Sequence, residues 1–208
     1  MRLALLLLAA PTLALAQVQP RAMIPNVPPI QGPDCTADAL TRALNGHGAG
    51  LPDHYLPGVS GIAFLATTCT DRCLCRDFRE VYVRARSVVG RLGWRVVYFD
   101  QSAPPGSPWD AMRRSIEKGI PVVGFNACGD FEDVPLVGYD LEKDQIWAMA
   151  PDGAAEPKAF SLSGWQGEPV TGYVVEGRSE AAPDPRAFER DQLVEAVGEK
   201  ERPLIEGG

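Results

Sequence analysis

Cys35 is the residue of this sequence best placed to act as a nucleophile. It follows a proline- and glycine-rich segment and opens a predicted helix. Backbone N–H groups without helical partners, together with the helix dipole, favour the thiolate form of a cysteine at such a position. The position therefore indicates thiol chemistry, such as attack on an acyl group.

A nucleophilic thiol needs a general base, and the chain has only two histidines, His47 and His54. His47 lies 12 positions beyond Cys35, and if the helix continues to Asn45 the axial separation is about 17 Å, far outside hydrogen-bond reach. His54 could loop back, because seven extended residues span up to about 23 Å. The other interpretation of His54 is a surface or turn histidine.

The N-terminus has the organisation of a cleavable export signal. A basic start at Arg2 precedes the apolar run 3–10 and an Ala-x-Ala exit at 14–16, which is typical of a secretory signal peptide. We expect cleavage near Ala16 and a secreted or periplasmic mature protein. The alternative, a membrane anchor, needs about 20 apolar residues, and Gln17 and Arg21 come too early.

The five cysteines form an odd set for an exported chain, which predicts two disulfides and one remaining thiol. Cys73 and Cys75 are too close in sequence to pair with each other, so we expect one to pair with Cys69 and the other with Cys128. Cys35 then keeps its thiol. The alternative is a four-thiolate zinc site, but export to an oxidising compartment and the absence of Cys-x2-Cys pairs favour disulfides, and we predict no metal and no cofactor.

The net charge of the chain excludes one class of partner. It is −7, and removal of the signal with Arg2, a single positive charge, takes −7 to −8. Such a charge opposes binding to nucleic acid or to an anionic membrane. A peptide, a small molecule or another protein is the expected partner.

The pattern of apolar residues predicts one α+β domain. We expect a signal peptide over 1–16, an extended proline-rich arm over 17–32, a domain over 33–200 and a disordered tail over 201–208. The expected helices span about 35–45, 77–92, 108–118 and 184–200. The expected strands span about 94–100, 121–125, 134–140, 144–150, 157–162 and 170–176, and they favour an antiparallel sheet.

Four segments, taken in order, resemble a known family. They are Cys35-Thr-Ala-Asp-Ala-Leu-Thr-Arg-Ala-Leu44, Gly58-Val-Ser-Gly-Ile-Ala-Phe64, Trp109-Asp-Ala-Met-Arg-Arg-Ser-Ile-Glu-Lys-Gly-Ile-Pro-Val-Val123 and Leu136-Val-Gly-Tyr-Asp140. The resemblance is to the papain-like cysteine peptidase and acyltransferase superfamily, in particular the N-terminal domain of butirosin biosynthesis protein H and bacteriocin-processing peptidases that cleave after double-glycine leaders. It implies a papain-like fold, with N-terminal helices packed on an antiparallel sheet.

The resemblance also implies site positions, and several hold unexpected residues. Cys35 matches the nucleophile, whereas the histidine position falls on Glu132, followed by Asp133 and Val134. The acid that orients the histidine falls on Ala150, with Asp152 nearby. The oxyanion-hole glutamine falls on Pro29, with Gln31 as the closest substitute.

A carboxylate beside Cys35 would oppose thiolate formation, the reverse of what an imidazolium does. The sequence therefore favours a secreted papain-like domain that has lost catalysis and binds a peptide or small ligand in the former active-site groove. The alternative is a cysteine-dependent peptidase or acyltransferase with an unorthodox base. A third interpretation makes Cys35 a small buried packing residue.

Overall fold

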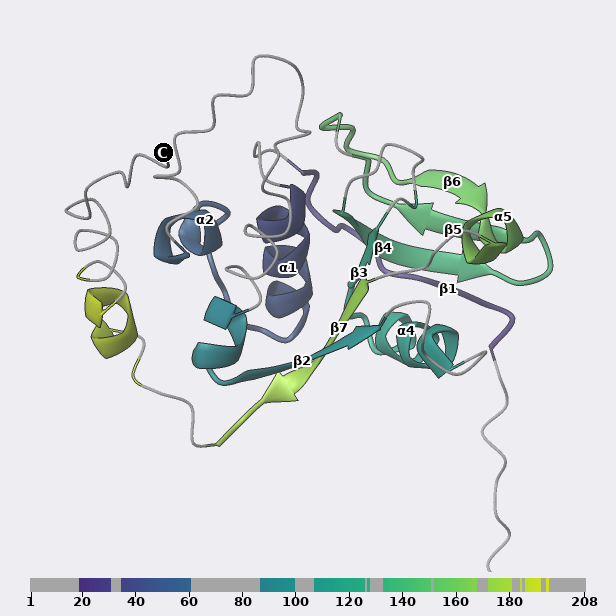
Figure 1. Cartoon of the computed structure of the whole chain (residues 1–208). Coiled ribbons are helices and arrows are strands. Elements are labelled where there is room, and N and C mark those ends of the chain that lie inside the picture. Colours follow the sequence, from purple (N-terminus) through teal and green to yellow (C-terminus); the bar gives the residue numbers. More distant parts are fainter. Residues whose placement is uncertain are drawn as a thin grey trace, which may run out of the picture.

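The computed structural model describes residues 19–30, 35–60, 87–99, 107–125, 127, 133–150, 152–167, 172–180, 184, 186–191 and 194. These residues form an α+β fold in which helices pack on a seven-stranded antiparallel sheet (Figure 1). The strand order is β2-β7-β3-β4-β5-β6, with β1 also paired to β4.

The bounds of the strands are as follows: β1 Arg21–Met23, β2 Trp94–Phe99, β3 Val122–Phe125, β4 Asp133–Asp140, β5 Gln145–Ala148, β6 Lys158–Ser161 and β7 Gly172–Arg178. The bounds of the helices are α1 Cys35–Gly46, α2 Tyr55–Val59, α4 Ser107–Glu117 and α5 Leu162–Gly167, and residues 87–91 and 186–191 are also helical.

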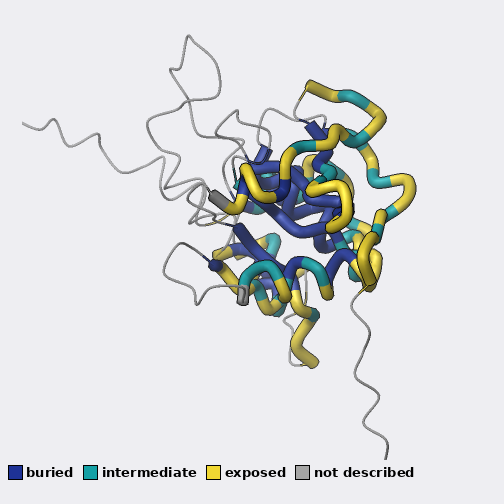
Figure 2. The backbone as a smooth tube through the Cα atoms, turned by 90° about the vertical axis from the view of Figure 1, so that its right-hand side faces the viewer, coloured by how far each residue is buried: buried dark blue, intermediate teal, exposed yellow. Residues whose placement is uncertain are grey.

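Strand β4 is the centre of the fold. Its first half pairs with β3 and its second half pairs with β1 along the same edge, while β5 occupies the other edge. All eight residues of β4 are buried, and Figure 2 shows the buried backbone gathered in the middle of the molecule. Because β4 is covered on both faces and paired along both edges, it holds the residues at its two ends in fixed positions.

The two faces of the sheet carry separate apolar cores. Val123 packs in the core that includes Leu40 and Leu44 of α1, whereas its neighbour Val122 packs in the core that includes Met112 of α4. Because successive residues of a strand point to opposite faces, α1 and α4 cover opposite faces. Figure 1 agrees, with α1 and α2 on one side of the central strands and α4 on the other.

The predicted organisation is confirmed at this level. The helix that begins at Cys35 packs on an antiparallel sheet containing the predicted strands at 121–125 and 134–140. Strand β1 is not predicted from the sequence, because only three residues of the proline-rich arm pair with β4. Helix α5 is not predicted either; it has six residues and is capped by Asp144, whose carboxylate accepts hydrogen bonds from the backbone N–H and hydroxyl of Ser163.

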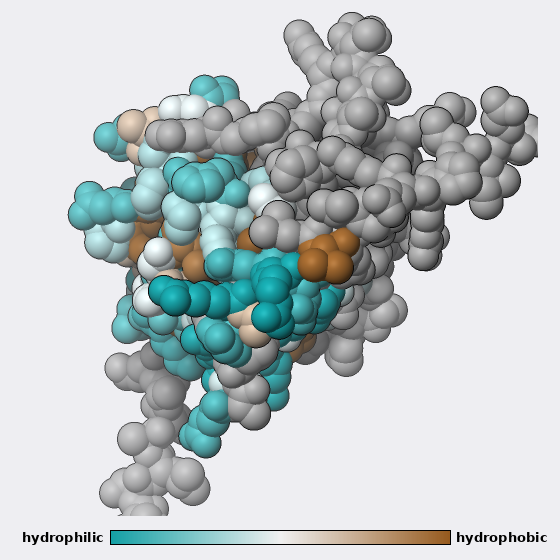
Figure 3. Space-filling model, turned by 90° about the vertical axis from the view of Figure 1, so that its left-hand side faces the viewer, coloured by the Kyte–Doolittle hydropathy of each residue, from teal (hydrophilic) through white to brown (hydrophobic). Residues whose placement is uncertain are grey.

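The exposed surface is polar over the described residues that Figure 3 presents, with only separate small hydrophobic areas. No helix in the described ranges is long and apolar enough to cross a membrane.

The helical segment 186–191 is held against α2 by Tyr55. Burial, followed by a hydrogen bond with Glu189, raises the pKa of Tyr55 to about 12. A raised pKa means that the folded state binds the phenolic proton more tightly than the unfolded state, so this stabilisation is fully present below pH 10 and is lost as pH rises through about 12. We expect phenolate absorbance of the native protein to show a tyrosine titrating near pH 12 that is missing from Tyr55→Phe. A Tyr55 signal near pH 10 would contradict the contact.

Candidate functional site

The first turn of α1 lies against the start of β4. Cys35 is the first residue of α1 and is 9% exposed, and it carries a thiol rather than a disulfide. The next residue, Thr36, donates a hydrogen bond from its hydroxyl to Oδ2 of Asp133, the first residue of β4, over 2.6 Å. A polar contact between residues 97 positions apart in sequence thus fixes the N-terminal end of the helix to the sheet.

Asp133 is a carboxylate buried within the protein, only 1% exposed. It pairs in register with Phe125 at the end of β3, and the Phe125 carbonyl accepts a 3.0 Å hydrogen bond from the indole N–H of Trp165 in α5. The end of α1 that bears Cys35 therefore meets an acidic side chain.

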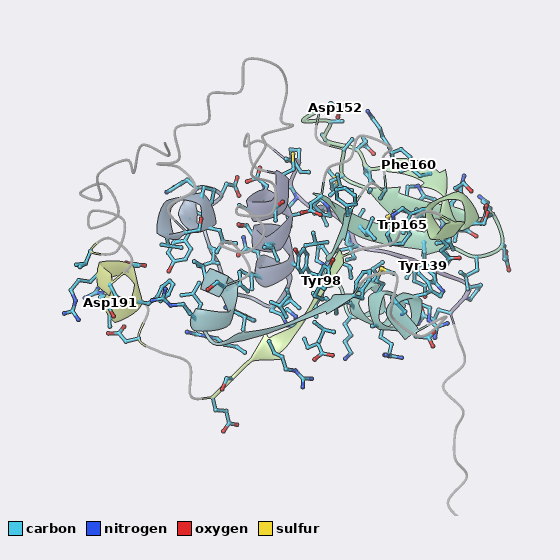
Figure 4. The ribbon with its side chains drawn as sticks, viewed as in Figure 1. Tyr98, Tyr139, Asp152, Phe160, Trp165 and Asp191 are labelled. Atoms are coloured by element: carbon cyan, nitrogen blue, oxygen red, sulfur yellow. The ribbon has the colours of Figure 1, made fainter. Side chains whose placement is uncertain are left out.

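The position expected for an orienting acid holds no acid. Ala150 is buried, and Asp152 lies at the tip of the loop that joins β5 and β6 (Figure 4). Asp152 is exposed and forms an ion pair with Lys158. The hydrogen bond from Lys158 lowers the pKa of Asp152. The carboxylate of Asp152 is therefore paired with a lysine at the surface.

His47 directly follows α1, and His54 directly precedes α2. His47 lies just after the C-terminal end of α1, opposite to Cys35, where its Nε2 lies 2.8 Å from the Val175 carbonyl and its ring contacts Trp94. The prediction that His47 is too far to serve Cys35 is confirmed. His54 is exposed and follows Asp53, which binds Arg42 two turns along α1 from Cys35.

Arg42 is a charged residue inside the protein, with a side chain only 2% exposed. Its guanidinium donates to the carbonyls of Pro28 and Pro29, at 3.2 and 2.8 Å, and to the carboxylate of Asp53. The hydrogen bond from Arg42 lowers the pKa of Asp53. One side chain of α1 therefore joins the end of the N-terminal arm to the loop before α2.

Several predicted site residues lie outside the described ranges: Gln31, Glu132, Cys69, Cys73, Cys75 and Cys128. Their assigned roles, including both disulfides, stay predictions. Within the described ranges, no group of three or more side chains that could hold a metal ion is found.

The sequence predicts Asp133 only as a neighbour of the histidine position and does not predict Thr36 or Arg42 as site residues. A signal for Arg42 existed, because it is seven positions after Cys35, on the stripe that also carries Ala39 and Ala43. A charged residue on the buried face of a helix is rare without a partner. Thr36 gave no comparable signal, since its partner is distant in sequence.

Comparisons of this chain with protein-family models, with curated proteins and with solved structures found no significant match. The interpretation of the site therefore depends on its own geometry.

Proposed function

We propose that this chain is an exported, papain-like domain that has lost catalysis and binds a peptide or a small ligand at the N-terminal end of α1. The observation that carries the proposal is the hydrogen bond between Thr36 and the buried carboxylate of Asp133. It places a carboxylate at the end of the helix that bears Cys35, where a cysteine peptidase has a histidine as its general base.

The charge of Asp133 supports the loss of catalysis. A carboxylate near a thiol repels the developing thiolate and has too low a normal pKa to remove a thiol proton efficiently near neutrality. His47, one of the two histidines of the chain, lies beyond the other end of α1, where it contacts the Val175 carbonyl. Cys35 is also buried, and burial generally disfavours a charged thiolate.

Substitution of Asp133 tests this electrostatic argument. In Asp133→Asn, an amide oxygen still accepts the hydrogen bond from Thr36 while the negative charge is lost. We expect alkylation of Cys35 by iodoacetamide, followed by intact-protein mass spectrometry, to be about tenfold faster at neutral pH, with its pH profile shifted to lower pH. Cys35→Ala should abolish the modification.

Thr36→Val is the matched control, because it removes the hydrogen bond and keeps the carboxylate. If the site merely loosens, both variants should react faster at every pH with no shift of the profile. An unshifted profile for Asp133→Asn would therefore contradict the proposal.

Binding is tested separately from reactivity. Immobilised mature protein is mixed with a random octapeptide library, and the retained and released peptides are identified by mass spectrometry. We expect a subset of peptides to be retained intact. Library cleavage that disappears in Cys35→Ala would instead favour the peptidase.

A further inference from the structure

The methionines of the chain differ in their exposure to solvent. Met112 in α4 and Met149 after β5 are each 1% exposed, whereas Met23, the last residue of β1, is 37% exposed. The remaining methionine, Met1, belongs to the predicted signal peptide and lies outside the described ranges. A thioether is oxidised when solvent reaches it and is protected when it is buried. Met23 is therefore the methionine of the mature protein that an oxidant in solution reaches first.

The thioether of Met23 lies over Gly138 of β4. The two residues are register partners, and a Cβ on Gly138 would be 2.7 Å from Sδ of Met23 and 3.1 Å from its Cε. Because Gly138 has no side chain, the sulfur occupies the space that a side chain would take. Gly138 in turn pairs with Trp147 of β5. Met23, Gly138 and Trp147 therefore form one row across three strands, on the same face of the sheet.

A second side chain of β1 reaches over β4 in the same direction. Arg21 pairs in register with Asp140, and its Nε lies 4.0 Å from Oδ2 of that residue. The guanidinium carbon of Arg21 lies 5.6 Å from the centre of the Trp147 ring. Arg21 and Met23 are two positions apart in a strand, so both lie on this face. Strand β1 thus contributes two side chains to the face, and Met23 is the apolar one.

Strand β1 is short, and few contacts attach it to β4 (Figure 1). Its three residues are flanked by two backbone hydrogen bonds of 2.8 Å, from the Leu141 N–H to the Pro20 carbonyl and from the Ile24 N–H to the Val137 carbonyl. A strand of this length forms few ladder hydrogen bonds, so each side chain that packs across the pair contributes to its stability. A change in Met23 is therefore expected to affect the attachment of the whole strand.

We propose that Met23 is a peroxide-sensitive modification site whose oxidation weakens the pairing of β1 with β4. A lone pair of Sδ attacks one oxygen of hydrogen peroxide, and the S–O bond forms as the O–O bond breaks. The hydroxide that leaves takes up the proton of the transferred oxygen. The sulfur is oxidised to the sulfoxide, and the peroxide is reduced to water.

The sulfoxide changes the chemistry of the contact with Gly138. A flexible apolar side chain becomes a polar, chiral one with a strong acceptor oxygen. The surface that it faces is the backbone of β4, which is already paired along both edges. An acceptor buried without a donor costs free energy. We therefore expect the oxidised side chain to turn toward solvent and to vacate the space over Gly138.

The experiment treats the native mature protein with hydrogen peroxide and locates the added oxygen by peptide mass spectrometry. We expect Met23 to be oxidised at least about tenfold faster than Met112 and Met149, and the difference to disappear in urea. In protein oxidised at Met23 alone, hydrogen exchange of peptides covering 19–24 should accelerate at least about tenfold, while exchange in β2 and β7 is unchanged.

Two variants separate the sulfoxide from other effects of peroxide. Met23→Leu keeps an apolar side chain without sulfur, so peroxide should leave its exchange at 19–24 within about twofold of the untreated value. Met23→Gln places a polar group over Gly138 and should reproduce the acceleration without peroxide.

Equal oxidation rates for the three methionines would overturn the proposal, and so would unchanged exchange at 19–24 after oxidation of Met23. Acceleration of the same size in peroxide-treated Met23→Leu would also overturn it, because another residue would then be responsible. These outcomes are independent of the proposed function. Met23 pairs with the second half of β4, whereas the proposed binding site involves Asp133, the first residue of that strand.

Discussion

Purified mature protein is expected to show peptide hydrolysis at least about 10⁴-fold below that of a cysteine peptidase with a complete Cys–His pair. Such a pair supplies a base for the thiol and an acid for the leaving group, and each proton-transfer role contributes about 10²–10⁴-fold. Here Asp133 approaches the first turn of α1, while His47 binds a backbone carbonyl at the far end of the helix. The helix dipole contributes only about 0.3–1 kcal/mol, less than one unit of pKa, and cannot replace an imidazolium.

The measurement is turnover of fluorogenic peptide and thioester substrates by the native protein, His47→Ala, His54→Ala and Cys35→Ala. All four proteins should give the same residual rate. Turnover that vanishes in both Cys35→Ala and His54→Ala would reveal a catalytic Cys–His pair. The protein would then be an active cysteine-dependent enzyme.

Gly172→Ala is expected to destabilise the fold by about 3 kcal/mol, because β7 and β3 approach each other too closely for a methyl group. A Cβ on Gly172 would lie 2.3 Å from the carbonyl oxygen of Val123 and 2.6 Å from the ring of Phe99. The backbone oxygen cannot rotate away, and β7 is held between β2 and β3. Relief therefore requires separation of two central strands, which should be measurable by urea unfolding.

Gly90→Ala is the matched control for this substitution. Gly90 is an exposed helical residue, and a Cβ there would have no atom within 4 Å. Alanine is favoured over glycine in a helix by about 1 kcal/mol, so Gly90→Ala should be neutral or stabilising. Equal unfolding midpoints for Gly172→Ala and the native protein would show that β7 and β3 are less closely paired than the structure indicates.

The elements that position the site could be predicted from local patterns. Helix α1 was predicted because its apolar residues repeat at helical spacing and Asn45-Gly46 marks its end, and β3 and β4 were predicted from short apolar runs after a glycine-terminated helix. Such signals involve residues close in sequence, so they can be recognised without knowledge of the tertiary structure. β1 could not be predicted, because three residues among prolines become a strand only when the edge of β4 is present to pair with them.

The sequence by itself determined that Cys35 opens a helix and that the chain offers only two histidines as a general base. It also determined that His47 is too distant from Cys35, because the length of a helix follows from its number of residues. Only the tertiary structure decided which side chains meet that helix. The contact of Thr36 with Asp133 joins residues 97 positions apart, and the hydrogen bonds of Arg42 join three separate segments. Pairings of this kind depend on how α1 is oriented on the sheet, which is fixed by the packing of the whole core rather than by any local pattern.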